Sequence, residues 1–128
     1  MNLNNLTIKT QEALQRAQQI ALDNDNPAIE VGHLLKGLLE VDENVAPFAF
    51  KKMGVNLDVV RQTADSIVSS YGKVDNNGQS YMSRTAADAV QKAHTYLKEF
   101  GDEYVALEHL LLGILNTRDQ VSQMLKDS

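Results

Sequence analysis

The chain has 128 residues, of which 43% are hydrophobic and 23% charged, a composition that fits one globular domain with a single core and argues against disorder. Its formal net charge is −5, and its 12 basic residues form no run longer than Lys51-Lys52, which excludes the electrostatic footprint of a nucleic-acid-binding protein. The absence of cysteine excludes disulfides, thiolate catalysis and cysteine-ligated zinc. Because long apolar runs and a signal-peptide pattern are also missing, we expect a cytoplasmic protein without a membrane segment.

The first half of the chain begins with two predicted helices. Thr7 is a suitable N-cap for a helix over about 7–22. The Asn26-Pro27 pair ends this helix, because the residue before a proline is disfavoured in helical angles. A second helix is predicted over 31–41.

Two further helices complete the first half. Asn44 is the expected cap of a short third helix, in which Pro47 occupies the tolerated first turn. The buried side of this helix is expected to consist of Phe48 and Met53, with Phe50 as a further candidate. Asn56 is the expected cap of a fourth helix over about 57–70.

The second half begins with a linker over about 72–82, which contains polar and turn-forming residues. Helices are then predicted over about 83–100, 106–116 and 119–126. The chain ends before it reaches a counterpart of the fourth helix, so we expect that helix to be absent from this chain.

Two segments of the chain, 29–40 and 105–116, repeat one pattern at an offset of 76 residues. In both, apolar residues recur at i, i+3, i+4, i+7 and i+8, which is typical of a helix with one buried face. A repeat of this kind predicts a unit that buries its apolar face against its own copy. Gly37 and Gly113 lie inside the two predicted helices, where glycine costs about 0.5–1 kcal/mol relative to alanine. We therefore expect the backbone of a neighbouring helix to approach closely at both glycines.

Three features of the chain point to a known family: a doubled His-Leu-Leu-x-Gly-Leu/Ile-Leu helix, the opening sequence Met-Asn-Leu-Asn-Asn-Leu-Thr and the stretch Gly101–Val105 before the second copy. In these features the chain resembles the N-terminal domain of Clp-family AAA+ unfoldases. The segments Lys73–Asp75 and Tyr81–Ser83 look most like the ClpB branch of the family, the bacterial Hsp104-type disaggregases. The resemblance covers nearly all of the chain.

The resemblance implies an all-α fold in one domain over 1–128, made of two pseudo-two-fold related repeats of about four helices each. Repeat one would cover about 3–71, the linker about 72–82 and repeat two about 83–128, without its last helix. The implied function is to bind exposed apolar segments of unfolded or aggregated proteins, for refolding under stress, with no catalysis and no cofactor in this domain. ATP and magnesium would be bound by the ATPase modules of a homohexameric parent protein, so the isolated domain is expected to be a monomer. An Hsp70-type chaperone system is an implied partner of the parent, whereas nucleic acid and membrane are not.

Two other functions are open at this stage. One is an adaptor-docking N-domain of a ClpC- or ClpA-type unfoldase, which serves an ATP-dependent protease. ClpC-type domains start the central helix of each repeat with Thr-Glu-His, and the two glutamates can receive phosphoarginine. This chain has Leu107-Glu108-His109 in the second repeat but Val31-Gly32-His33 in the first, so one glutamate is missing. The other is a structural helical bundle that binds no ligand.

Neither a metal site nor a catalytic site is expected. His33 and His109 lie beside the apolar stripes and are more typical of buried imidazoles that hydrogen-bond a neighbouring helix end or hydroxyl. Glu108-His109 lacks the i, i+4 histidine pair of a zinc helix. The acidic loop over 23–27 is not a calcium loop, since Pro27 stands at a ligand position. No glycine-containing stretch is followed by the Lys-Ser/Thr of a phosphate loop, so ATP binding is not expected either.

The candidate site for an unfolded protein segment is a cleft between the two repeats. From the resemblance and from their positions, we place Thr7, Asp102 and Glu108 on its polar rim, where a hydroxyl and two carboxylates can meet backbone amides or basic side chains. Helix capping and interaction with the helix dipole are the competing roles for these three residues. Ala86, Val90 and Leu110 are the candidates for an apolar floor, with burial in the core as the competing interpretation of each.

Overall fold

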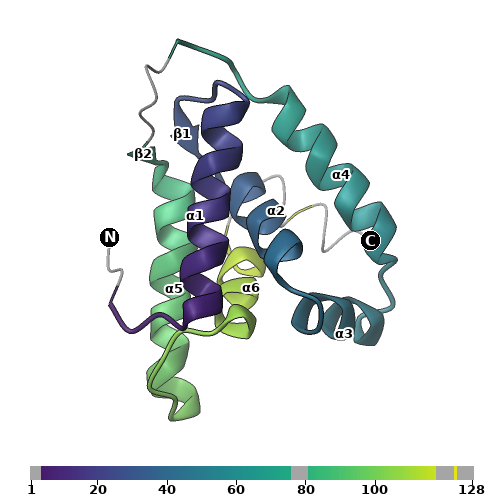
Figure 1. Cartoon of the computed structure of the whole chain (residues 1–128). Helices are drawn as coiled ribbons and strands as arrows, with labels where there is room; N and C mark the ends of the chain where they lie inside the picture. Colours follow the sequence, from purple (N-terminus) through teal and green to yellow (C-terminus); the bar gives the residue numbers. More distant parts are fainter. Residues whose placement is uncertain (1–3, 76–80, 118–122, 124–128) are drawn as a thin grey trace.

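The computed structural model describes residues 4–75, 81–117 and 123 and shows a mostly helical domain (Figure 1). Its elements in chain order are α1 (Ile8–Asp23), β1 (Ala28–Ile29), α2 (Val31–Val41), α3 (Val45–Lys52), α4 (Leu57–Ser70), β2 (Tyr81–Met82), α5 (Arg84–Phe100) and α6 (Leu107–Leu115). The helices predicted over 7–22, 31–41, 57–70, 83–100 and 106–116 are confirmed to within a residue at each end. The helix predicted over 119–126 lies outside the described part of the chain.

Both repeats start their first helix with a hydroxyl cap. The Oγ1 atom of Thr7 accepts the backbone N–H of Thr10 at 3.2 Å, and the Oγ atom of Ser83 accepts that of Ala86 at 3.1 Å. Asn56 caps α4 in the same way. Each cap satisfies a backbone donor that has no partner within its own helix, so these helix starts follow directly from the sequence.

The start of α3 differs from the expected cap. Asn44 holds the N-cap position, but its side chain makes no capping hydrogen bond. Asp42 caps the helix instead: its carboxylate accepts the N–H groups of Asn44 and Val45 at 2.9 Å and that of Ala46 at 2.6 Å. A buried carboxylate that receives three N–H groups satisfies more donors than one amide oxygen could.

The buried face of α3 also differs from the prediction for two of its three residues. Phe50 is fully buried, but Phe48 is 65% exposed and Met53 is 44% exposed. Ala46, which is buried, and Phe50 are four residues apart and share one face of the helix. Phe48 lies two residues from each and therefore points to the opposite side.

The fold is all-α, as predicted, and two short extended contacts join its repeats. Strand β1 pairs with β2 in parallel, with Ile29 opposite Met82. Leu6 forms an isolated parallel bridge with Val105. Leu6 and Met82 are 76 positions apart, and so are Ile29 and Val105. The two pairings are thus one contact made twice, which shows that the repeats are related by a pseudo-two-fold axis.

Backbone hydrogen bonds repeat the same exchange at the helix starts. The N–H of Thr7 donates to the carbonyl of Val105, and the N–H of Ser83 donates to the carbonyl of Ile29, both at 3.0 Å. These extended residues need partners for their backbone groups, because they are fixed between helices and partly buried. Each repeat therefore orients the first helix of the other.

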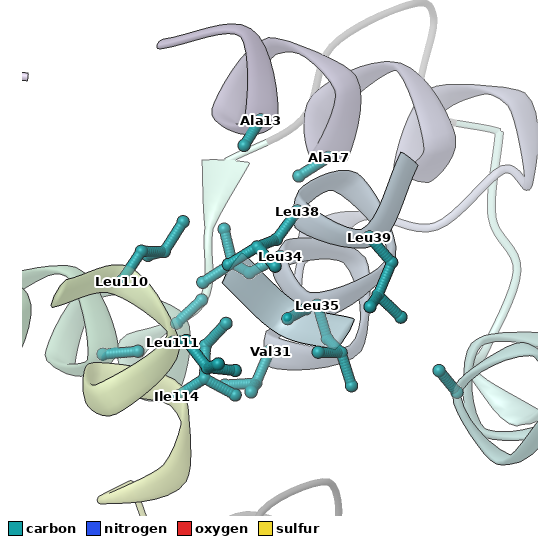
Figure 2. Close-up of a cluster of buried hydrophobic side chains, with 14 of the residues drawn as sticks. Ala13, Ala17, Val31, Leu34, Leu35, Leu38, Leu39, Leu110, Leu111 and Ile114 are labelled. Atoms are coloured by element: carbon teal, nitrogen blue, oxygen red, sulfur yellow. The ribbon is translucent and has the colours of Figure 1, made fainter. Parts of the chain in front are cut away.

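The two central helices, α2 and α6, form the middle of the core, as predicted. Figure 2 shows side chains of α6 meeting those of α2, with Ala13 and Ala17 of α1 on another side of α2. The central apolar side chains are at most 3% exposed; they are Val31, Leu34, Leu35, Leu38, Leu110, Leu111 and Ile114. Burial on this scale accounts for most of the stability of a domain of this size.

The glycines inside the central helices mark close helix contacts, as predicted. A Cβ atom placed on Gly37 would lie 2.4 Å from the carbonyl oxygen of Ala13, and one on Gly113 would lie 2.2 Å from that of Ala89. Ala13 and Ala89 occupy the same position in α1 and α5. Only a residue without a Cβ lets the two helices of each repeat pack at this distance.

Candidate functional site

An open groove of about 500 Å³ lies between the two repeats. Its lining comes from the start of α1, from the segment that runs from the last residue of α2 to the first residue of α3, and from the start of α6. The lining residues are Thr7, Lys9, Val41, Asp42, Glu43, Asn44, Val45, Ala106, Leu107 and Glu108. We call this surface the inter-repeat groove. It contains Thr7 and Glu108, two of the three residues predicted for the rim of the site.

The inter-repeat groove combines apolar side chains with charged ones. Val41 and Val45 are half-buried and give it an apolar wall. The carboxylates of Glu43 and Glu108 are exposed, and that of Glu108 has no hydrogen-bond or ion-pair partner among the described residues. Glu108 also lies in the first turn of α6, where the helix dipole stabilises a negative charge. The groove therefore offers a carboxylate acceptor beside an apolar surface.

Thr7 and Lys9 form the α1 side of the inter-repeat groove. The Thr7 hydroxyl oxygen caps α1 and also lies 2.8 Å from the hydroxyl oxygen of Thr10. The Nζ atom of Lys9 lies 3.7 Å from a carboxylate oxygen of Glu12 and 3.5 Å from the carbonyl oxygen of Val41. Thr7 therefore performs the capping role that the sequence suggests for it, while its side chain remains half-buried at the edge of the groove.

Asp102, the third predicted rim residue, does not line the inter-repeat groove. Its carboxylate accepts the Nε2–H of His109 at 2.8 Å, and its side chain is 49% exposed. The Nδ1 atom of His109 accepts the backbone N–H of Ala106 at 2.8 Å. Because Nδ1 is an acceptor, the neutral imidazole must carry its proton on Nε2. Asp102 and His109 thus fasten the loop before α6 to the first turn of that helix.

The first repeat contains the same arrangement around a second buried histidine. The Nδ1 atom of His33 accepts the N–H of Glu30, and its Nε2–H donates to the side-chain oxygen of Asn26, both at 2.8 Å. Burial, helped by the positive charge of Lys36, lowers the pKa of His33 to about 4. His33 is therefore neutral at pH 7 and serves as a structural connector.

The partners of both histidines differ from the expected neighbouring helix end or hydroxyl. Each imidazole bonds to the backbone N–H three residues before it and to a side chain seven residues before it. The signal was present in the sequence, because Asn26 and Asp102 are also 76 positions apart. In the parts of the chain that the structure describes, no group of three or more His, Cys, Asp or Glu residues is placed to hold a metal ion.

The three residues predicted for the apolar floor lie in the core and not in the groove. Ala86 is completely buried, and Val90 and Leu110 are each 1% exposed. They pack against the central helices as part of one apolar cluster, which is the competing interpretation given for them above. The apolar lining of the groove comes instead from Val41, Val45, Ala106 and Leu107, which the sequence analysis did not select.

Residues 5–128 match the sequence profile of the Clp repeat (R) N-terminal domain, and the chain belongs to this family. Its relatives include two proteins named chaperone protein ClpB. The one from Bacteroides thetaiotaomicron is 44% identical over 128 residues and the one from Porphyromonas gingivalis is 38% identical over 128 residues, in both cases across 100% of this chain. The chain spans only 15% of the length of these two relatives.

Solved structures of two N-terminal domains have the same fold. The Hsp104 N-terminal domain from Candida albicans matches with a TM-score of 0.81 and 18% identity, over 97% of this chain and 79% of that one. The N-terminal domain of the ClpD chaperone from Arabidopsis thaliana matches with a TM-score of 0.73 and 20% identity, over 99% of this chain and 86% of that one. The mostly helical fold of two repeats is therefore that of a Clp N-domain.

A membrane span is also not found among the described helices, none of which is both long enough and apolar enough to cross a bilayer.

Proposed function

We propose that this chain is the client-binding N-terminal module of an ATP-dependent protein disaggregase, where a client is an unfolded or aggregated protein with exposed apolar segments. The single observation that carries the proposal is the inter-repeat groove, which places the exposed Glu108 carboxylate beside the apolar surface of Val41 and Val45. The similarity to ClpB chaperones across the full chain supports the same function.

The groove suits an extended polypeptide. Backbone N–H groups or basic side chains of the client donate to Glu108, while an apolar client side chain packs on Val41 and Val45. Thr7 lies at the edge of the groove. Asp102 lies outside the groove, but its hydrogen bond to His109 holds the start of α6, and with it Glu108, in place. Binding is weak, because a small groove must offset the entropy lost when a flexible chain becomes ordered.

The proposal assigns no catalysis and no cofactor to this domain. Binding and hydrolysis of ATP with magnesium belong to the AAA+ modules of the parent protein, which assembles as a homohexamer. A cytoplasmic location and cooperation with an Hsp70-type system are part of the same proposal. The isolated 128-residue chain is then a monomer, and sedimentation should show one species near 14.2 kDa.

The ClpC-type alternative requires a glutamate at the start of both central helices. Glu108 provides one at α6, but α2 has Gly32 in that position. Gly32 is buried, and a Cβ atom there would lie 2.5 Å from the hydroxyl oxygen of Tyr71. A glutamate would not fit at this position without moving Tyr71, so we favour the disaggregase-type function.

The test is a titration of fluorescently labelled ribonuclease A, kept unfolded by reduction and carboxamidomethylation, against the wild-type chain and Glu108→Ala. The control variant is Asp23→Ala, which removes an exposed carboxylate at the far end of α1, about 24 Å from its start at the helical rise per residue. We expect weaker binding only for Glu108→Ala, with the same circular dichroism for all three proteins. Equal affinity of the three would remove Glu108 from the site.

A further inference from the structure

The pseudo-two-fold axis gives the domain two equivalent helix starts, one at α2 and one at α6. Gly32 and Glu108 hold the same place in them, directly before His33 and His109. The two places differ in exposure: Glu108 is exposed and lines the inter-repeat groove, whereas Gly32 is buried. The hydrogen bonds of His33 and His109 have the same geometry in both repeats, so they do not explain this difference in exposure.

The cause at α2 is Tyr71, which directly follows α4. The backbone N–H of Gly32 donates to the Tyr71 hydroxyl oxygen at 3.2 Å. The Tyr71 ring lies against the His33 ring, with 5.1 Å between the ring centroids and 50° between the planes. Helix α4 packs against α2 (Figure 1), and Tyr71 at the end of α4 therefore lies at the start of α2. Tyr71 therefore binds the backbone N–H of Gly32 and also fills the space above the start of α2.

Glycine is what makes this arrangement possible. A Cβ atom on residue 32 would lie 2.5 Å from the Tyr71 hydroxyl oxygen and 3.3 Å from the Tyr71 ring carbon Cε2. Glu108 carries a Cβ atom at the equivalent place in α6. A ring placed over α6 as Tyr71 is placed over α2 would collide with that Cβ. Among the described residues, the start of α2 at Gly32 is therefore covered by Tyr71, whereas Glu108 at the start of α6 is exposed.

We propose that Tyr71 is a specificity-determining residue that confines client binding to the α6 side of the domain. A client segment at α2 would have to displace the hydrogen bond to Gly32 and the ring contact with His33, whereas at α6 it meets an exposed carboxylate. The domain therefore binds one extended unfolded segment, although its fold is a duplication. This inference rests on the proposed function of the inter-repeat groove.

The test follows the backbone amides of both helix starts by NMR while the same unfolded ribonuclease A is added to the isotope-labelled chain. In wild type, we expect the amides of Leu107 and Glu108 to shift and those of Val31 and Gly32 to stay in place. Tyr71→Ala uncovers α2, so Val31 and Gly32 should then shift as well. Tyr71→Phe is the matched control: it removes only the hydroxyl group and keeps the ring over the helix start, so Val31 and Gly32 should shift less than in Tyr71→Ala.

Two results would overturn the inference while leaving the proposed function intact. One is a shift of the Gly32 amide in wild type that equals the shift of Glu108. The other is a folded Tyr71→Ala variant whose Val31 and Gly32 amides do not respond. If Tyr71→Ala fails to fold, Gly32→Ala gives the same readout at Val31, because its Cβ atom displaces the hydroxyl group. A client that shifts neither helix start contradicts the proposed function and this inference together.

Discussion

Replacing Gly37 by alanine should destabilise the domain, although the same change inside an exposed helix stabilises it by about 0.5–1 kcal/mol. The new Cβ atom would lie 2.4 Å from the Ala13 carbonyl oxygen and 2.9 Å from the Ala17 nitrogen, whereas ordinary contacts begin at 3.4 Å. Both atoms belong to backbone, so α1 and α2 must separate by about 1 Å. Overpacking of this kind costs about 1–3 kcal/mol, which exceeds the gain in helix propensity.

Urea unfolding followed by circular dichroism measures this loss. The matched control is Gly72→Ala, because no atom lies within 4 Å of a Cβ at that position and its backbone does not require glycine. We expect a net loss of about 1–2 kcal/mol for Gly37→Ala and no loss for Gly72→Ala. A Gly37→Ala variant as stable as wild type would refute the claim that glycine is needed for the close contact of the two helices.

Three further predictions concern the core, the α3 cap and the buried histidine. Leu35→Ala or Leu111→Ala should cost about 2–5 kcal/mol in urea unfolding, through lost burial and a cavity; a loss below about 1 kcal/mol would contradict the core assignment. Asp42→Ala should cost about 1–2 kcal/mol and Asn44→Ala clearly less, because Asp42 supplies the capping oxygens; the reverse order would restore Asn44 as the cap. Burial lowers the pKa of His33 from 6.5 to about 4, so between these values the unfolded chain binds a proton that the folded chain does not. Wild type should therefore lose stability relative to His33→Gln as the pH falls from about 6.5 to about 4, by about 3 kcal/mol at most, and parallel pH profiles of the two proteins would count against a neutral, buried His33.

The sequence was sufficient to predict the helices of the described part of the chain and the duplication. Apolar periodicity marked the central helices, and residues such as Thr7 and Asn56 marked where helices begin, because both signals depend on local chemistry. The glycine contacts were also predictable, since an unfavourable residue that recurs at Gly37 and Gly113 needs a packing reason. The 76-residue offset predicted the duplication, whereas the pseudo-two-fold relation of the repeats was implied by the family resemblance.

The sequence was insufficient for features that depend on contacts between distant parts of the chain, such as strand pairing and the burial of particular side chains. The pairing of β1 with β2 is two residues long and leaves no periodic pattern. Phe48 and Phe50 are alike in hydrophobicity, and only the packing direction of α3 separates the exposed ring from the buried one. For the same reason the sequence could not separate the groove from the core: Val90 and Leu110 lie on apolar stripes, but a stripe does not show whether it faces another helix or an open surface.

Photo-crosslinking from single introduced cysteines tests most directly the central claim that clients bind in the inter-repeat groove. The chain contains no cysteine, so a benzophenone label can be attached at one chosen position. Glu43→Cys places the label on an exposed residue of the groove, and Asp23→Cys places it on an exposed residue at the opposite end of α1. We predict that unfolded ribonuclease A crosslinks to the label at position 43 and not to the label at position 23, and that unlabelled unfolded protein competes for the product. Equal crosslinking at both positions, or crosslinking at position 23 alone, would contradict the proposed binding site.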